Sequence, residues 1–128
     1  MRLFVYGSLM RGRAANRLLA GLPGAARVGR ATLRARLYDL GEYPGAVLDD
    51  VADGEVFGEL WVARYSRDAL GALDRYEAYF PARPAESLFL RRRVRVRTPD
   101  ASTTAWAYVL PRVPPHARPL PAGRWPQA

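Results

Sequence analysis

The sequence predicts an α+β domain, built as a small mixed β-barrel of about six strands with two flanking helices. Its 128 residues suit a single domain, and 49% of them are apolar, which is typical of a folded globular chain and not of a disordered one. Segments with the two-residue alternation of β-strands outnumber helical segments. The connections between strands are too short for the crossovers of a parallel sheet, so most strand pairs are expected to be antiparallel.

The first half of the chain is expected to hold three strands and one short helix. Residues 3–6 form a continuous apolar run, which predicts a central strand buried on both faces. Residues 13–20 have a helix-forming composition and precede a glycine and a proline, which predicts a short helix. Residues 32–40 alternate apolar and polar side chains, as a half-buried strand does. A turn-rich segment leads into the apolar residues 46–48, and residues 49–54 predict another turn.

The middle of the chain predicts a long strand followed by the clearest helix. Residues 55–65 alternate over most of their length, and Gly58 among them indicates a bulge or a close approach of another backbone. The helix is expected over residues 67–79, with Ser66 as its N-cap and the two prolines that follow as its terminators.

The last third predicts two strands and a proline-rich segment. Residues 88–98 alternate with one solvent-facing side, and residues 103–110 form the final strand. Residues 111–128 hold six of the eleven prolines, which excludes a helix or a paired inner strand. We expect this segment to wrap in extended form across the single domain of residues 1–128, with Leu120 and Trp125 as its anchors.

The basic and sulfur-containing residues exclude several kinds of chemistry. All 20 basic residues are arginine, so a lysine Schiff base and the lysine-dependent phosphate loop are excluded. There is no cysteine, which removes disulfides, thiol nucleophiles and thiolate metal sites. His116 is the single histidine, so carboxylates are almost the only metal ligands left. The apolar run near the start is far shorter than a signal peptide or a membrane span, so we expect a cytoplasmic protein with no membrane partner.

The net charge of +8 favours the approach of anions. Arg91, Arg93, Arg95 and Arg97 share one face of an expected strand and could follow the phosphates of a nucleic acid. A solvated strand face is the commoner meaning of such alternation, and no ordered set of aromatic residues accompanies it. The arginines are spread along the whole chain, as a coding bias toward arginine would place them. We therefore expect no nucleic-acid partner.

Glu77 is the first candidate for catalysis. On a helical wheel it lies only about 20° from Leu70 and on the same stripe as Leu73, so its carboxylate points toward the core. Burial of such a group raises its pKa toward neutrality, as a proton-transferring carboxylate requires. The alternative is that Glu77 lies at a fraying helix end and turns to water, or pairs with Arg75 or Arg83.

The second candidate is the turn Tyr6-Gly7-Ser8-Leu9, where the first strand ends. Glycine permits backbone conformations that let successive N–H groups converge on an anion, and Ser8 adds a hydroxyl donor, so the turn could hold a carboxylate. The alternative is an ordinary turn from a strand into a loop. A serine hydrolase is disfavoured, because Ser8 lacks the glycine-flanked elbow of such enzymes and His116 lies in the proline-rich segment.

These segments combine with several others into an ordered set of motifs. The set consists of FVYGSLM (residues 4–10), LYDLGEYPG (37–45), GEL (58–60), LDRYE (73–77), LFLRR (88–92) and GRW (123–125). Over nearly the whole chain and in this order, the sequence resembles the gamma-glutamylcyclotransferase-like family, in its AIG2-like branch. The pairing of YGSL with LDRYE is the most specific part of the resemblance.

The resemblance implies a closed mixed barrel and a cyclotransferase that needs no metal or cofactor. It implies that Tyr6, Gly7, Ser8 and Leu9 hold the α-carboxylate end of a γ-glutamyl group and that Glu77 is the acid/base. The α-amine of the substrate would then attack the γ-carbonyl and release 5-oxoproline from a γ-glutamyl amine or γ-glutamyl amino acid. The family often has tyrosine where Phe89 stands, so a hydroxyl contact is missing there.

The expected partner is therefore a small γ-glutamyl substrate, and the expected assembly is a monomer or homodimer. The alternative is a non-catalytic module on the same fold that binds a small carboxylate ligand or a partner protein. Fold alone does not decide between the two.

Overall fold

The apolar run near the start of the chain forms β1 (Arg2–Val5) in the computed structural model, which describes residues 1–49 and 53–126. β1 lies between two strands, pairing antiparallel with β4 (Glu55–Val62) and parallel with β6 (Ser102–Val109). Leu3 and Phe4 point to opposite sides of the strand, and each is 1% exposed. The prediction of a central strand buried on both faces is confirmed.

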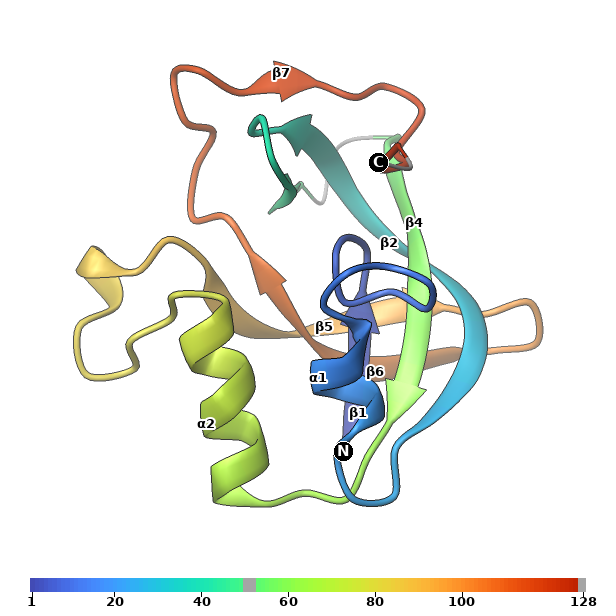
Figure 1. The fold of residues 1–128 in the computed structure, drawn as a ribbon. Helices are drawn as coiled ribbons and strands as arrows, with labels where there is room; N and C mark the ends of the chain where they lie inside the picture. Colours follow the sequence, from blue (N-terminus) through green and yellow to red (C-terminus); the bar gives the residue numbers. More distant parts are fainter. Residues whose placement is uncertain (50–52, 127–128) are drawn as a thin grey trace.

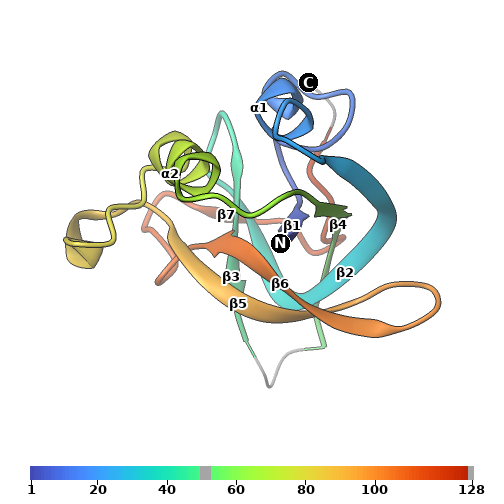
Figure 2. The same cartoon turned by 90° about the horizontal axis from the view of Figure 1, so that it is seen from below.

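The pairing of the neighbouring strands closes the barrel. β6 pairs with β5 (Leu90–Arg97), β4 pairs with β2 (Ala26–Asp39), and β2 meets β5 at Thr32 and Leu33. In the part of the chain that the structure describes, five strands thus form a closed ring in the order β2-β4-β1-β6-β5, in which only the β1–β6 pair is parallel (Figures 1 and 2). The predicted small mixed barrel is confirmed.

Two further strands lie outside the ring, on β2. β3 (Pro44–Leu48) pairs with the second half of β2, and the short β7 (Arg118–Pro119) pairs with Tyr38 and Asp39 of the same strand. β2 is longer than the predicted residues 32–40, because it begins before a bulge between Arg27 and Gly29 that interrupts the alternation.

Two groups of apolar side chains make up the core. One fills the barrel and includes Phe4, Leu33, Val56, Leu60 and Val96. The other packs the helices against the outer side of β1 and β6, and it includes Leu3, Leu19, Trp61, Leu73 and Tyr108. Both helices accordingly lie on one side of the barrel, as Figure 2 shows.

Gly58 lies where β4 crosses the end of β1. A Cβ atom at this position would stand 2.2 Å from the carbonyl oxygen of Val5 and 2.9 Å from the ring of Phe4. Of the two expectations for this glycine, the close backbone approach is confirmed.

The helices are shorter than predicted. α1 spans Asn16–Ala20, since residues 13–15 form turns, and α2 spans Arg67–Tyr76. The predicted N-cap of α2 is confirmed, because the Ser66 hydroxyl accepts a hydrogen bond from the Ala69 N–H at 3.0 Å. Neither helix has the length and apolar character of a membrane-crossing segment in the described part of the chain.

The prediction that prolines end α2 is wrong. Ala78 adopts a left-handed conformation, with φ of 52°, and its N–H donates to the Arg75 carbonyl. The Tyr79 N–H donates back to the Asp74 carbonyl, which completes a Schellman-type end before Pro81 is reached. A short 3₁₀ turn, η1 (Pro84–Glu86), follows before β5.

The proline-rich segment runs along β2 and β4 in extended form (Figure 1). The Leu120 N–H donates to the Leu37 carbonyl at 2.8 Å, and the Phe57 N–H donates to the Gly123 carbonyl at 2.8 Å. The Leu120 side chain packs on the barrel core. Residues 127–128 lie outside the described residues, as do residues 50–52 at the centre of the turn expected over residues 49–54.

Candidate active site

A cavity of about 310 Å³ opens where β1 ends, between the end of α2 and the segment that enters β3. All five residues predicted to form the site line it: Tyr6, Gly7, Ser8, Leu9 and Glu77. The other lining residues are Phe4, Val5, Glu42, Tyr43, Pro44, Tyr76, Leu88, Phe89 and Tyr108. The fold therefore brings together the two segments that are about 70 residues apart in the sequence.

The turn after β1 is held by its own backbone. The Met10 N–H donates to the Gly7 carbonyl at 3.1 Å, and the Ala15 N–H donates to the Ser8 carbonyl at 3.1 Å. Among the described residues, no group of the chain accepts a hydrogen bond from the N–H of Ser8 or Leu9. Both residues line the cavity, so we expect these two free amides to be available to an anion there.

The physical reason for glycine at position 7 differs from the prediction. Gly7 has no positive φ, so the turn does not use the special backbone conformations expected of a glycine there. A Cβ atom there would instead stand 2.9 Å from the Pro44 side chain, so glycine is needed for space. This close approach sets the wall of the cavity beside the turn.

The Tyr6 hydroxyl is used by the protein itself. It donates to the Tyr108 carbonyl at 2.7 Å and accepts from the Ala46 N–H at 3.0 Å, which joins β1, β6 and β3. Burial raises the pKa of Tyr6, so the hydroxyl stays neutral. Tyr6 can thus offer a bound molecule its ring and backbone, whereas its hydroxyl is already occupied.

Glu77 stands directly after the last turn of α2, and its N–H still donates to the Leu73 carbonyl at 3.0 Å. The side chain is partly buried in the cavity wall, and burial raises the pKa of Glu77 to about 7. No arginine pairs with it in residues 1–49 and 53–126, and Arg83 pairs with Glu86 instead. The open alternative of an ion pair with Arg75 or Arg83 is therefore wrong.

The neighbouring Tyr76 connects the helix end to the turn. Its hydroxyl lies 2.6 Å from the Ser8 hydroxyl, and either group can be the donor. The contact joins the end of α2, where Glu77 follows, to the turn that carries the two amides. When the Tyr76 hydroxyl is the donor, the Ser8 hydroxyl keeps its single hydrogen for a hydrogen bond to a bound molecule.

A buried ionic network behind the cavity was missed by the sequence reasoning. Asp74 is 7% exposed, accepts a hydrogen bond from the Tyr108 hydroxyl at 2.6 Å and forms a salt bridge with Arg91. Burial and the contact with Asp74 raise the pKa of Tyr108. The Arg91 guanidinium lies 5.3 Å from the ring centre of Tyr79 and 5.2 Å from that of Trp106.

The prediction that Arg91 faces solvent is therefore wrong. The alternation predicts a solvent-facing side that holds Arg91, but Arg91 is half-buried, and Phe89, two residues before it on the same side, is buried. The reason is that α2 and the segment after it cover this end of β5. The one signal in the sequence was Asp74 itself, which stands one residue from the buried Leu73 on the helix.

The charge of the cavity is the reverse of the charge of the protein. Of the residues that the structure describes, Glu42 and Glu77 are the only charged ones that line it, and none of the 20 arginines does so. Phe89 lines the cavity and packs against Tyr43, with ring centres 6.1 Å apart. In the described ranges, no group of three or more histidine, aspartate or glutamate side chains is arranged to hold a metal ion. The site therefore offers the amides of Ser8 and Leu9, the mutually bonded hydroxyls of Ser8 and Tyr76, and the Glu77 carboxylate of raised pKa.

Comparison with protein families places this geometry in a known group. The family described as Gamma-glutamyl cyclotransferase, AIG2-like, matches residues 3–127. A search of curated proteins finds no match.

The chain is similar to several solved structures, among them the following three. Protein ytfP from Escherichia coli is 30% identical, over 98% of this chain and 96% of that one, with a TM-score of 0.65. YkqA from Bacillus subtilis is 24% identical with a TM-score of 0.73, and the match covers 97% of this chain but only 39% of YkqA. An AIG2-like protein (ggact) from Mus musculus is 22% identical, over 89% of this chain and 79% of that one, with a TM-score of 0.69. At under 25% identity, the last two support the fold alone.

Proposed function

The chain belongs to the gamma-glutamyl cyclotransferase, AIG2-like family, and from that premise we propose that it releases 5-oxoproline from γ-glutamyl amines or γ-glutamyl amino acids. One observation carries the proposal. A carboxylate whose pKa is raised to about 7 by burial shares a cavity with the available amides of Ser8 and Leu9.

The proposed reaction needs one group that can both accept and donate a proton. Glu77 takes a proton from the α-ammonium of the substrate, and the freed amine attacks the γ-carbonyl carbon. A new C–N bond closes the five-membered lactam as the bond to the leaving nitrogen breaks. Glu77 then gives its proton to the departing nitrogen, and it passes on in the same way the second proton that the attacking nitrogen loses as it becomes the lactam N–H. The amine therefore leaves as an ammonium ion, and Glu77 ends in its starting form. With a pKa of about 7, Glu77 exists in both forms near neutral pH.

Most of the rate enhancement is expected from positioning. The reacting groups belong to one molecule, and well-oriented intramolecular reactions reach effective molarities of about 10⁵ M or more. The N–H groups of Ser8 and Leu9, with the Ser8 hydroxyl, are proposed to hold the α-carboxylate and so to fold the substrate into its reactive shape. Gly7 leaves Pro44 close enough to limit the width of the cavity beside them.

The charges lining the cavity also suggest which leaving group it favours. Glu42 and Glu77 repel a second carboxylate, and no arginine compensates for it. We therefore expect γ-glutamyl amines to be turned over with a higher kcat/KM than γ-glutamyl amino acids, which carry a carboxylate on the leaving group.

The test is to measure 5-oxoproline by mass spectrometry after incubation with both classes of γ-glutamyl compound. Glu77→Gln keeps the shape of the side chain but removes the proton acceptor, so turnover should fall by about 10²-fold or more while binding persists. Glu42→Gln is the matched control, since it neutralises the other carboxylate of the cavity, and it should keep turnover with amine substrates. Wild-type turnover in Glu77→Gln would overturn the role of Glu77.

A protein that is stabilised by γ-glutamyl compounds but forms no 5-oxoproline would instead be the non-catalytic module. The same samples distinguish the two, because thermal unfolding reports binding and mass spectrometry reports product.

A further inference from the structure

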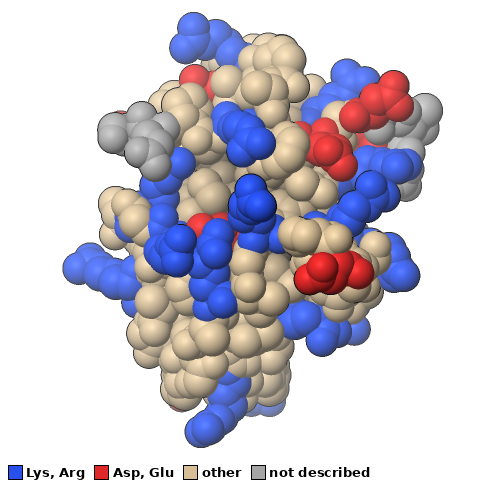
Figure 3. Space-filling view, turned by 90° about the vertical axis from the view of Figure 1, so that its right-hand side faces the viewer, with Lys and Arg blue, Asp and Glu red and all other residues tan. Residues whose placement is uncertain are grey.

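A second hollow, of about 550 Å³, is lined by residues of β2 and β4 among others and by none of α2. It shares no lining residue with the candidate active site. Five of its residues are arginines, and Figure 3 shows arginine side chains gathered on this face of the molecule. We call it the arginine hollow, after its basic residues Arg13, Arg27, Arg30, Arg97 and Arg124.

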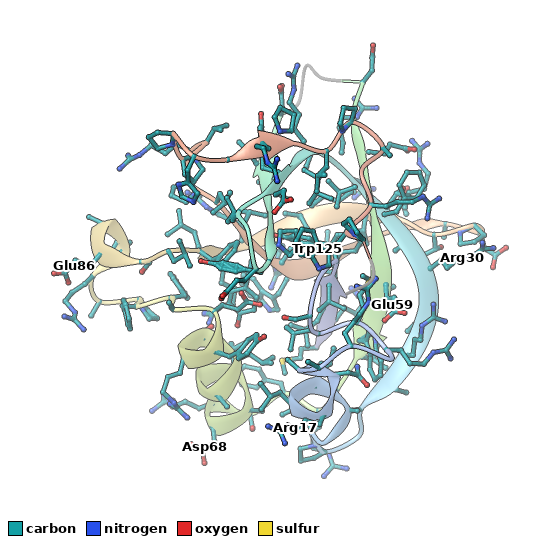
Figure 4. The ribbon with its side chains drawn as sticks, turned by 45° about the horizontal axis from the view of Figure 1, so that its top comes forward. Arg17, Arg30, Glu59, Asp68, Glu86 and Trp125 are labelled. Atoms are coloured by element: carbon teal, nitrogen blue, oxygen red, sulfur yellow. The ribbon has the colours of Figure 1, made fainter. Side chains whose placement is uncertain are left out.

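The fold collects these arginines from four separate segments. Arg13 comes from the loop after β1, Arg27 and Arg30 from β2, Arg97 from the end of β5, and Arg124 from the proline-rich segment. Strand pairing sets their spacing, because Arg30 stands opposite Glu59 and Arg97 stands opposite Thr32, two residues further along β2. Figure 4 shows Arg30, Glu59 and Trp125 on this side of the barrel.

The positive charge of the hollow is only partly neutralised. Glu59, 8% exposed, accepts hydrogen bonds from the Arg27 side chain at 2.9 Å and from the Arg11 N–H at 2.8 Å. Burial alone would raise the pKa of Glu59, but these bonds and one from Trp61 lower it, so the carboxylate stays ionised. Glu55 is the second acid of the lining, so the described residues around the hollow carry an excess of three positive charges.

Three of the five arginines are already held in place. Arg27 is fixed by Glu59, and Arg13 donates to the carbonyl oxygens of Trp125 and Pro126, which are neutral and leave its charge uncompensated. The Arg124 guanidinium lies over the ring of Phe57, 4.0 Å from its centre. Groups fixed in advance lose little conformational entropy when an anion binds.

The other two arginines are open to solvent. Arg30 and Arg97 are exposed, and within the described ranges neither forms an ion pair with a carboxylate. A coding bias toward arginine would scatter such residues over the surface. It does not by itself explain why five converge on one hollow while none lines the cavity beside Glu77.

We propose that the arginine hollow binds a small molecule that carries two or more linked phosphate groups and is about the size of a nucleotide. The planar guanidinium forms paired hydrogen bonds with phosphate oxygens, and a single carboxylate could not balance the excess charge. Its volume lies within the range of about 300–1,000 Å³ usual for small-molecule sites. Trp125, Phe57 and Met10 also line the hollow and supply apolar surface beside the charges.

The experiment is calorimetric titration of the full chain with pyrophosphate, ATP, orthophosphate and a single-stranded oligothymidylate at one fixed salt concentration. We expect pyrophosphate and ATP to bind at one site, with affinities at least about tenfold above that of orthophosphate. The double variant Arg30→Gln/Arg97→Gln should bind pyrophosphate and ATP about tenfold more weakly, or worse. Both residues are exposed, so the fold is not at risk.

The matched control is Arg34→Gln/Arg95→Gln, which removes two exposed arginines from the same strands, β2 and β5, but outside the hollow. It should keep the affinity for pyrophosphate within about twofold. Equal weakening by both double variants would show diffuse attraction and overturn the proposal. So would an absence of binding heat for pyrophosphate and ATP, or binding of the oligothymidylate alone, which would indicate an extended nucleic-acid surface.

Discussion

Glu77 makes the clearest prediction for a single residue, because its proposed role requires ionisation near neutral pH. Only the carboxylate form can accept a proton from the substrate, and burial raises the pKa of Glu77 to about 7. We expect kcat/KM to rise with pH up to about 7 and to level above it. Initial rates of 5-oxoproline formation across the pH range measure this dependence. A profile in which kcat/KM already levels off near pH 4.5, the ordinary pKa of glutamate, would contradict the prediction.

The same pKa predicts how stability depends on pH. The pKa of Glu77 is higher in the folded state, at about 7, than its ordinary value of 4.5, so the folded protein binds this proton more tightly. The resulting stabilisation is full below 4.5 and is lost as the pH rises through about 7. Because glutamine resembles the protonated form, Glu77→Gln should be more stable than the wild type by about 1–3 kcal/mol above pH ~8.

Urea unfolding at both ends of the pH range measures this difference. It should shrink toward zero as the pH falls to 4.5, where the wild type is protonated too. Glu42→Gln serves as the control, since Glu42 is exposed and its change should leave stability nearly unaltered. A Glu77→Gln variant that is less stable than the wild type at high pH would contradict this prediction, because it would mean that folding stabilises the ionised carboxylate.

At the scale of elements, Asp74 attaches α2 to the barrel. It accepts from Tyr108 on β6 and pairs with Arg91 on β5, and Glu77 lies three residues further along the chain. Asp74→Asn would leave the half-buried Arg91 without its counter-charge, so we expect a loss of about 3 kcal/mol. Tyr108→Phe removes one hydrogen bond to a charged group and should cost about 1.5–3 kcal/mol.

Urea unfolding measures the free energy of unfolding that Asp74→Asn and Tyr108→Phe lose, and Asp68→Asn is the control on the same helix. Asp68 is exposed in the first turn, so its loss should cost no more than about 1 kcal/mol. If Asp74→Asn and Asp68→Asn are equally stable, the network does not attach the helix.

The end of α2 offers a change that should stabilise the protein. Ala78 has a φ of 52°, a conformation that glycine adopts without strain and that costs an alanine about 1–2 kcal/mol. Part of that gain is offset by the greater freedom of glycine in the unfolded chain. Ala78→Gly should therefore raise the free energy of unfolding by about 0.5–1 kcal/mol, measured in urea. Destabilisation would mean that the methyl group makes contacts worth more than the strain.

The elements show where sequence reasoning succeeds and where it stops. The Ser66 cap and the buried β1 depend on neighbours in the chain, so local patterns predict them. Periodicity on α2 likewise placed Glu77 beside the core, although the helix ends before it. The burial of Arg91 was not predicted, because it depends on α2 packing over β5. The end of α2 was not predicted either, because it depends on an unusual conformation of Ala78.

Over the whole molecule, local sequence patterns also fail to predict where charged residues gather. The arginines look evenly scattered in the sequence, yet barrel closure brings five of them to one hollow and none to the cavity beside Glu77. Only strand pairing between β2, β4 and β5 and the course of the proline-rich segment reveal that arrangement. The chain order of the motifs could predict the family but not this distribution.

The proline-rich segment provides a prediction about the whole chain, because Gly123 is its tightest contact with the barrel. Gly123 has a φ of 70°, and a Cβ atom there would stand 1.9 Å from the Glu55 carbonyl oxygen. Gly12 is a matched control, with a φ of 82° and open space around the same position. Both changes to alanine carry a backbone strain of about 1–2 kcal/mol, but only Gly123→Ala must also push the segment away from β4.

Gly123→Ala should therefore be less stable than Gly12→Ala by at least about 1 kcal/mol in urea. It should also expose the neighbouring backbone, because the Phe57 N–H loses its bond to the Gly123 carbonyl. Trypsin should then cleave after Arg124 faster in Gly123→Ala than in Gly12→Ala, as followed by mass spectrometry under native conditions. Equal cleavage and equal stability would mean that the contact of the segment with β4 contributes nothing, and that its contacts with β2 and Arg13 hold it.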